Sequence, residues 1–268
     1  ALTAWHGLVE IGGMPNLQGL SETQLQELER PLPYIVLVHS AAGGVGLWAS
    51  EIAARRGAIV IGVMGSEKKA EVFRQRILPL SPSSTTILRG DEKTFGTRLQ
   101  ALLKDMRDSP EVDEECIGVD LVMESLGGKY FQASFDALRR GGSLVTFGST
   151  TYVSPGLGVN PIKLIWRYLT RPKVDPGDLT ARNIRLAGFN LIYLTDQPRQ
   201  LRKELAECIA CLGGSSKRSE SPNLALVTPP IVGNIFNFKT ETVQAMEHLK
   251  SGQTFGKVVL DNSQNNAV

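Results

Sequence analysis

The chain has 268 residues, of which 42% are hydrophobic and 21% are charged. This composition is typical of a globular protein, and it excludes a collagen, a disordered tail and a coiled coil. The 29 basic and 27 acidic residues leave a net charge of +2, which does not favour a nucleic-acid or membrane-surface protein. No apolar run approaches the roughly 20 residues that span a bilayer. The three cysteines favour a reducing compartment over a disulfide framework, so we expect a cytoplasmic location.

The N-terminal stretch reads Ala-Leu-Thr-Ala-Trp-His-Gly, without an initiator Met or the basic segment of a signal peptide. We therefore expect a piece of a longer protein. Ser21 and Gln24 have the spacing of a capping box, which predicts a short helix that reaches about Glu29 before two prolines end it. Residues 1–33 are expected to form helices and a linker that lead into the next domain.

Short apolar, β-branched runs then alternate with helical stretches of about ten residues. A continuous apolar run of this kind is typical of a strand that is buried on both faces of a parallel sheet. Alternating strands and helices indicate β-α-β units, so the sequence predicts an α/β fold with a doubly wound parallel sheet and helices on both faces. The expected strands are 34–39, 58–64, 85–88, 119–123, 143–147 and 186–191, and the expected helices are 47–56, 67–76, 97–106 and 130–139.

Three further stretches interrupt or follow this alternation. An Asn-Pro pair favours the start of a short helix over 161–169. A Ser-rich stretch over 213–228 predicts a flexible loop. The segment 229–268 then predicts a strand, a helix closed by Gly252 and a second strand, over 231–236, 241–250 and 257–260.

The most informative segment is the turn over residues 41–46, Ala-Ala-Gly-Gly-Val-Gly, which joins the first expected strand to the first expected helix. Small residues are needed where a pyrophosphate approaches the backbone closely, and the helix N-terminus supplies free N–H groups and a positive dipole. Ala41 stands in the place of the first glycine of the usual pattern. A glycine cluster alone would indicate only a structural turn, but its strand-turn-helix context predicts a dinucleotide-binding domain, which we assign to 34–212.

The end of the second strand decides which dinucleotide this turn would bind. NAD-preferring sites carry an acidic residue there, about 20 residues beyond the glycines, to bind the ribose 2′-hydroxyl. Met64 occupies that place, and Ser66, Lys68 and Lys69 follow it. These groups favour a 2′-phosphate and hence NADP(H). The alternative interpretation is that both lysines lie on an exposed first helical turn.

Four segments in order along the chain carry a family resemblance: VHSAAGGVG (38–46), GVDLVMESLGG (118–128), GGSLVTFGS (141–149) and FGKVVL (255–260). They resemble the medium-chain dehydrogenase/reductases, in the zinc-free branch of quinone oxidoreductases and enoyl reductases. RPKVDP and GFNL, at 171–176 and 188–191, resemble the VAT-1-like proteins in particular. Family members begin with a GroES-like substrate lobe. The resemblance therefore implies that this chain is the nucleotide-binding lobe, that the GroES-like lobe is missing, and that 229–268 would return to it.

The resemblance also implies a binding site for NADP(H). It places the pyrophosphate at the glycine-rich turn, the 2′-phosphate after the second strand, the nicotinamide ribose after the fourth strand and the nicotinamide ring after the fifth and sixth strands. The segment 254–257 would close over the cofactor. The implied cofactor residues are Ala42, Gly43, Gly44, Val45, Gly46, Ser66, Lys68, Lys69, Ser125, Leu126, Gly148, Ser149, Phe189, Asn190, Thr254 and Lys257. We expect no metal ligand and identify no catalytic residue.

The implied activity is that of an NADPH-dependent, zinc-independent oxidoreductase, which passes hydride to a quinone or to an electron-poor double bond of a small carbonyl substrate. Two alternatives stay open: a nucleotide-binding VAT-1-like interaction protein with little turnover, and an enoyl reductase domain of a fatty-acid or polyketide synthase. Such enoyl reductases carry a proton-donating Lys after the fifth strand and an Asp after the sixth, where this chain has Ser149 and Ile192. The aromatic-basic pair that often follows the third strand is not evident in residues 88–91, so the adenine end of the site stays open.

Other candidate residues receive structural interpretations. Cys208 and Cys211 have C-x-x-C spacing without a second pair of ligands, which favours a half-buried helix face over a zinc site. His39 ends a buried strand and is interpreted as a structural histidine rather than a base. Glu124 is interpreted as a strand-end carboxylate that binds backbone.

The resemblance also implies how the chain associates with other lobes and with other copies of itself. The sixth strand lies at a sheet edge that can pair with a second copy, so we expect a homodimer. Apolar residues that would contact the missing lobe should be uncovered. These are Leu8, Ile11, Ile231, Val232 and Phe236.

Overall fold

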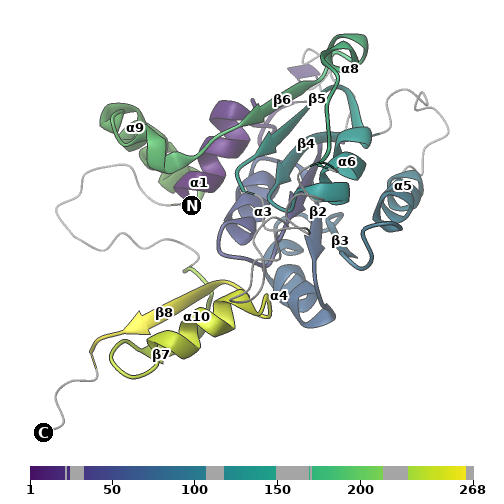
Figure 1. Cartoon of the computed structure of the whole chain (residues 1–268). Helices are drawn as coiled ribbons and strands as arrows, with labels where there is room; N and C mark the ends of the chain where they lie inside the picture. The colour runs from purple at the N-terminus through teal and green to yellow at the C-terminus, as the bar shows by residue number, and fades with distance from the viewer. Residues whose placement is uncertain are drawn as a thin grey trace, which may run out of the picture.

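The computed structural model describes residues 1–21, 23–24, 33–106, 118–148, 169, 171–213 and 229–263. Within these ranges, six parallel strands form one sheet in the order β3-β2-β1-β4-β5-β6 (Figure 1). The sheet grows outward from β1 in one direction and from β4 in the other, so the order reverses between these two strands. In open sheets of this kind, ligands bind outside the carboxyl ends of the strands at such a switch point. The predicted doubly wound α/β fold is confirmed.

Strands and helices follow one another closely in the predicted order. The strands are β1 (Ile35–His39), β2 (Ile59–Met64), β3 (Thr85–Leu88), β4 (Val119–Glu124), β5 (Leu138–Thr146) and β6 (Arg185–Gly188). The helices that accompany them are α3 (Gly46–Arg55), α4 (Glu67–Ile77), α5 (Phe95–Asp105), α6 (Gly128–Asp136), α8 (Pro176–Ala181) and α9 (Pro198–Cys211).

Both faces of the sheet carry apolar side chains, and each face is covered by its own helices. On β1, Val36 and Val38 lie in a core cluster with side chains of α3 and α4, whereas Leu37 lies in a second cluster with side chains of α5 and α6. Successive side chains of a strand point to opposite faces, so a strand that is covered on both sides has no solvent-exposed position. All five residues of β1 are buried for this reason.

The N-terminal residues pack into the first of these clusters. α1 (Leu2–Trp5) continues directly into η1 (His6–Ile11), a π-helix that the sequence did not predict. Leu8 is fully buried in the cluster, so the prediction that it would be uncovered is wrong. Arg56, just beyond α3, holds the stretch that follows η1 in place, because its guanidinium donates a hydrogen bond of 2.8 Å to the carbonyl oxygen of Met14.

The predicted capping box is present. Ser21 N donates to Gln24 Oε1 at 2.9 Å, and Gln24 N donates to Ser21 Oγ at 3.3 Å. Most of the helix that this box would start lies outside the described residues. The predicted helix over 161–169 and the predicted loop over 213–228 also lie outside them, apart from Leu169 and Gly213.

The predicted boundary between α6 and β5 is wrong. The helix was expected to reach residue 139, but it ends at Asp136 because Leu138 already pairs with Val119 as the start of β5. The buried Arg139 guanidinium forms an ion pair with the Asp120 carboxylate of β4 and holds this early part of β5 in the sheet.

The sixth strand also ends earlier than predicted. β6 stops at Gly188 rather than at residue 191. The Oδ1 of Asn190 accepts a hydrogen bond from Ile192 N at 3.2 Å and starts a 3₁₀-helix, η4 (Leu191–Leu194). An Asn side chain that binds the backbone in this way competes with the ladder of a strand. β6 remains the edge of the sheet among the described strands.

The C-terminal part forms the predicted strand-helix-strand unit, with β7 (Val232–Asn237), α10 (Thr242–Lys250) and β8 (Lys257–Asp261). Gly252 has φ +68°, the left-handed conformation expected of a residue that closes a helix. β7 and β8 pair in parallel as a separate sheet, and Figure 1 shows the unit extending away from the six-stranded sheet.

Much of the apolar surface of the C-terminal unit is uncovered, including the residues Ile235 and Val243, which are 65% and 68% exposed. Val232 is exposed as predicted, whereas Ile231 and Phe236 are half-buried, as is Ile11. No helix in the described part of the chain has the length and hydropathy that crossing a membrane requires.

Candidate functional site

The turn between β1 and α3 brings the start of the helix very close to the end of the strand. A Cβ atom on Gly46 would lie 2.2 Å from Ser40 O and 2.7 Å from the Cα of Ala41. Ser40 itself has φ +53°, in the left-handed region that few residues other than glycine adopt, and its carbonyl oxygen accepts a hydrogen bond of 2.8 Å from Gly43 N. Gly46 therefore has the role of the glycine that permits close packing of helix and strand.

The two glycines in the middle of the turn have more room. A Cβ atom on Gly43 would lie 3.1 Å from Ser40 O, and one on Gly44 would lie 2.7–2.8 Å from the end of the flexible Lys257 side chain. Ala41 is fully buried in the core, so its methyl group occupies the first-glycine position without reaching the open side of the turn. That open side lies at Gly43 and Gly44, next to the Lys257 amine.

The C-terminal segment lies against this turn. Gly256 N donates a hydrogen bond of 2.8 Å to Ala42 O, and Gly256 forms a parallel β-bridge with Gly43. Thr254 and Phe255 precede this contact and are half-buried. Residues of the expected closing segment and of the glycine-rich turn therefore meet, although about 200 residues separate them in the sequence.

Ser66, Lys68 and Lys69 lie together at the start of α4, beyond the carboxyl end of β2. Ser66 is the N-cap residue, is exposed and makes no capping hydrogen bond with its side chain. The Lys68 amine lies 5.8 Å from the centroid of the Phe255 ring, and the Lys69 amine donates a hydrogen bond of 2.6 Å to Gly252 O. Burial, followed by the nearby Arg89 charge, lowers the pKa of Lys69 from its ordinary value.

Arg89 belongs to the same cluster, and the sequence analysis did not assign it a role. Its guanidinium lies 3.2 Å from the position of a Cβ atom on Gly65, and its backbone N donates to Met64 O at 2.7 Å. Arg89 immediately follows β3, which pairs in parallel with β2. The carboxyl ends of adjacent parallel strands lie at one edge of a sheet, so a basic residue directly after the third strand was a usable signal.

Ser125 and Gly148 meet at the other side of the switch point. Ser125 Oγ donates a hydrogen bond of 3.3 Å to Ser40 Oγ and links the ends of β4 and β1. A Cβ atom on Gly148 would lie 3.9 Å from the Cβ of Ser125. Phe189 directly follows β6, where its backbone N donates a hydrogen bond of 3.1 Å to Thr146 O, and its ring lies against the rings of His6 and Phe147, with centroid distances of 4.9 Å and 6.2 Å. Ser149 lies outside the described residues, and Asn190 starts η4 as described above.

Glu124 supports the turn that carries Ser125 and Leu126. Its Oε1 accepts hydrogen bonds of 2.8 Å from both Leu126 N and Gly127 N, and the side chain is buried. Burial raises the pKa of this carboxyl group, while the two backbone hydrogen bonds lower it. The interpretation of Glu124 as a carboxylate that binds backbone is confirmed.

His39 is fully buried at the end of β1, and its Nε2 lies 2.7 Å from Ser134 Oγ. The Ser134 hydroxyl donates to Tyr130 O at 2.8 Å, so it accepts from the imidazole, which is then the neutral Nε2–H tautomer. Burial, and secondarily the Arg89 charge, lowers the pKa of His39 to about 3. These contacts agree with a structural role.

The two cysteines of α9 also have structural surroundings. Cys208 is fully buried in the core cluster that contains α3, and Cys211 packs against the same cluster. Burial raises the pKa of Cys208 to about 11, so its thiol is not activated. Over the described ranges, no group of three or more His, Cys, Asp or Glu side chains is placed to hold a metal ion. Zinc independence of the whole protein stays a prediction.

The sheet order and the glycine-rich turn at the switch point define a Rossmann fold. Residues 44–208 match the sequence profile of the family described as zinc-binding dehydrogenase, over more than half of the chain. The chain belongs to this family.

Curated relatives include polyketide synthases, of which the chain spans only a small part. The chain is 26% identical over 265 residues, 98% of its length, to the highly reducing polyketide synthase pspA of Penicillium soppii, but spans 8% of that protein. It is 28% identical over 190 residues, 67% of its length, to a mycocerosic acid synthase-like polyketide synthase of Mycolicibacterium smegmatis, and again spans 8% of it.

Solved structures share the fold. Mycobacterial Rv1454c complexed with NADPH matches 97% of this chain with a TM-score of 0.61 and 22% identity, and the chain covers 62% of it. The nucleotide-binding subdomain of the enoylreductase domain of PpsC from Mycobacterium tuberculosis matches 79% of this chain with a TM-score of 0.54 and 23% identity, and the chain covers 91% of it.

Substitutions at Gly46 and at Gly43 should have different effects, the first on stability and the second on dinucleotide binding. Gly46→Ala should lower the free energy of unfolding by about 1–3 kcal/mol, because its methyl group would overlap the backbone of Ser40 and Ala41. Gly43→Val should leave the fold intact yet stop dinucleotide binding, since its side chain fills the open side of the turn. Urea denaturation and a cofactor titration measure the two effects. Normal cofactor binding by folded Gly43→Val would show that the phosphate site lies elsewhere.

The buried His39 predicts a loss of stability in acid. Between its ordinary pKa near 6.5 and its folded value of about 3, the unfolded chain binds a proton that the folded chain does not. The free energy of unfolding should therefore fall as the pH falls through this range, at a rate approaching about 1.4 kcal/mol per pH unit. His39→Gln should reduce that slope between pH 6 and pH 4 in denaturation experiments. An identical slope in the variant would contradict the assignment.

Proposed function

We propose that the chain is the nucleotide-binding lobe of an NADPH-dependent reductase. The observation that carries this proposal is the convergence of three cations, Lys69, Arg89 and Lys257, on one edge of the sheet around an open glycine-rich turn. Anions bind where backbone N–H groups at a helix N-terminus and cationic side chains converge. The NADPH complexes among the proteins of the same fold support this choice of ligand.

The residues fit the parts of the cofactor in order. The turn over 42–46 would hold the pyrophosphate, because its middle glycines leave the backbone open and the α3 N-terminus faces that side. Lys257 would add a positive charge at the same place. Ser125, Gly148 and Phe189 would line the nicotinamide end, and Leu126, Ser149, Asn190 and Thr254 belong to the same proposal.

The 2′-phosphate would lie among Ser66, Lys68, Lys69 and Arg89. The Ser66 hydroxyl makes no capping hydrogen bond, and Glu67 is paired with Arg74 at 2.7 Å. Arg89 is well suited to this role because a guanidinium can bind a phosphate with two parallel hydrogen bonds.

The bound cofactor would supply hydride for an electron-poor double bond or a quinone. The chain's own residues would bind and orient it, with Glu124 fixing the turn that carries Ser125. The polyketide synthases among the relatives favour the reading as an enoyl reductase domain. The exposed Ile192 counts against the proton delivery of that branch, because it occupies the place where such domains carry an Asp. A quinone oxidoreductase and a VAT-1-like interaction protein with little turnover are the alternatives.

We expect tighter binding of NADPH than of NADH, measured by titrating the intrinsic tryptophan fluorescence. Arg89→Gln and Lys69→Ala should each weaken NADPH about tenfold and leave NADH within about twofold, because a charge-assisted phosphate contact contributes about 1.5–3 kcal/mol. Arg140→Gln, an exposed arginine in the early part of β5, serves as the control. Equal affinities for the two dinucleotides in the wild-type chain would contradict the proposed 2′-phosphate site.

We further propose that turnover requires a GroES-like substrate lobe. The uncovered apolar side chains of the C-terminal unit support this, as does the coverage of only 62% of the NADPH-bound neighbour. The chain alone should bind NADPH but oxidise it negligibly with an enone or a quinone, since positioning contributes several kcal/mol to such reactions. A version extended upstream through that lobe should turn over. Full activity of the chain alone would refute the two-lobe reading.

A homodimer and a cytoplasmic location complete the proposal. The β6 edge supports dimerisation, because an unpaired strand edge can extend the sheet into a second copy. Sedimentation velocity measures the oligomeric state, and a strictly monomeric chain would contradict the pairing of β6 edges. The free thiols of Cys208 and Cys211 suit a reducing compartment, and imaging of the tagged full-length protein would test the location.

A further inference from the structure

We infer that Arg76 is a positioning residue, which holds the C-terminal segment so that the Lys257 amine stays over the glycine-rich turn. The inference rests on the proposed nucleotide binding. It gives a role in that binding to a residue that touches neither the turn nor, in the proposed arrangement, the cofactor.

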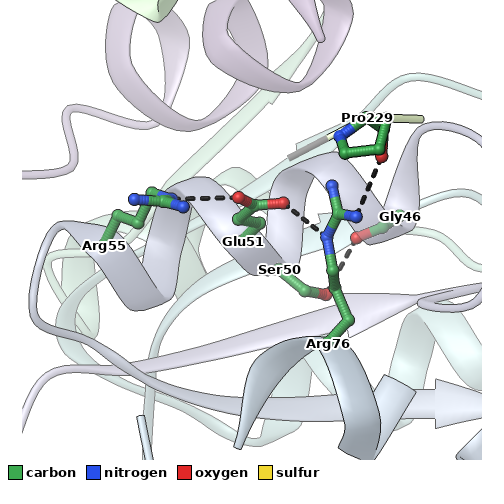
Figure 2. A network of polar contacts seen from close by, with 6 residues as sticks. All are labelled: Gly46, Ser50, Glu51, Arg55, Arg76 and Pro229. Carbon is green, nitrogen blue, oxygen red and sulfur yellow. Dashed lines mark hydrogen bonds and ion pairs between the residues drawn. The ribbon is translucent and has the colours of Figure 1, made fainter. Parts of the chain in front are cut away.

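Arg76 joins a buried acidic side chain to the C-terminal segment (Figure 2). Its Nε donates to Glu51 Oε2 at 2.7 Å, and its Nη1 donates to Pro229 O at 2.9 Å. Glu51 lies on α3 with a fully buried side chain, and Arg55 binds its other oxygen at 2.9 Å. The guanidinium carbon of Arg76 also lies 5.4 Å from the centroid of the Trp48 ring, so the side chain is held on several sides.

Backbone contacts link the position of Pro229 to the position of Lys257. Ile231, two residues further on, accepts a hydrogen bond of 2.8 Å from Lys257 N. A Cβ atom on Gly256 would lie 2.2 Å from Ile231 O, so these two stretches of chain pack without a gap. Pro230, Ile231, Gly256 and Lys257 also line, with Gly44 and Arg76, one small cavity beside the turn. A displacement of Pro229 would therefore displace Lys257 from Gly44.

The buried carboxylate explains why an arginine is needed here. A charge taken out of water is costly unless it is paired and hydrogen-bonded, and Glu51 meets this condition through two guanidinium groups. Arg76 can bind the carboxylate with one nitrogen and a carbonyl oxygen with another, because its donors form a rigid fork. A lysine would offer a single ammonium group and could not keep both partners in this geometry.

Five proteins test the inference by fluorescence titration with NADPH and NADH: the wild-type chain, Arg76→Gln, Arg55→Gln, Lys257→Met and the Arg76→Gln/Lys257→Met double variant. Lys257→Met should weaken both dinucleotides about tenfold, the effect of one charge-assisted phosphate contact. Arg76→Gln should weaken both about fivefold. In the double variant, the loss should stay within about twofold of that for Lys257→Met alone, because the two residues act through one contact. Arg55→Gln, which removes the other guanidinium from Glu51, should leave both affinities within about twofold.

Independent losses that multiply in the double variant would overturn the inference, as would an equal loss in Arg55→Gln. Hydrogen exchange adds a direct readout: amides of 252–257 should exchange faster in Arg76→Gln than in Arg55→Gln. If Arg76→Gln is too unstable to measure, Arg76→Gln combined with Glu51→Gln removes both charges and should give the same binding loss. A wild-type chain that binds neither dinucleotide would instead refute the proposed function itself.

Discussion

The close approach of α3 to the end of β1 constrains the rest of this structure. Because Gly46 has no side chain, the helix can start where a Cβ atom would lie only 2.2 Å from Ser40 O, and Ser40 adopts a left-handed conformation to complete the turn. That packing aims the first N–H groups of α3 past the carboxyl ends of the strands. It also leaves the Ala42 carbonyl free to accept from Gly256, which fixes where the C-terminal segment meets the main sheet.

The C-terminal unit depends on this attachment for its order. Two strands and one helix bury little apolar surface by themselves, and small β structures of this size are marginally stable in isolation. Contacts that tie the C-terminal segment down include the bridge from Gly256 to Gly43, the bond from Arg76 to Pro229 O and the bond from Lys69 to Gly252 O. Each of these contacts comes from an element that also borders the proposed cofactor site. Binding of a cofactor and order in the C-terminal unit should therefore be linked.

The sequence predicted the fold well where the physics is local or repetitive. Doubly buried strands such as β1 show as continuous apolar runs, and capping groups such as Ser21, Gln24 and Gly252 act within a few residues. The sequence did not predict features that depend on a contact with a residue far away along the chain. β5 begins early because Arg139 forms an ion pair with Asp120 of β4. Leu8 is buried because it lies on a π-helix that packs into the core. Arg76 was missed for the same reason, since its partners Glu51 and Pro229 lie on other elements. Arg89 was missed although its place directly after β3 was a usable signal.

Lys69 and Arg89, two cations near the ends of β2 and β3, would contribute differently to the binding of a phosphate. Burial and the Arg89 charge already lower the pKa of Lys69, so the structure disfavours its protonated form. A phosphate placed beside it would favour that form again, so binding there would be coupled to proton uptake and would weaken at alkaline pH. Arg89 does not have to release a carbonyl oxygen such as Gly252 O, as Lys69 would if it turned toward the ligand. In the proposed site, Arg89 could therefore turn to a 2′-phosphate without losing such a contact, whereas the contribution of Lys69 would depend on pH.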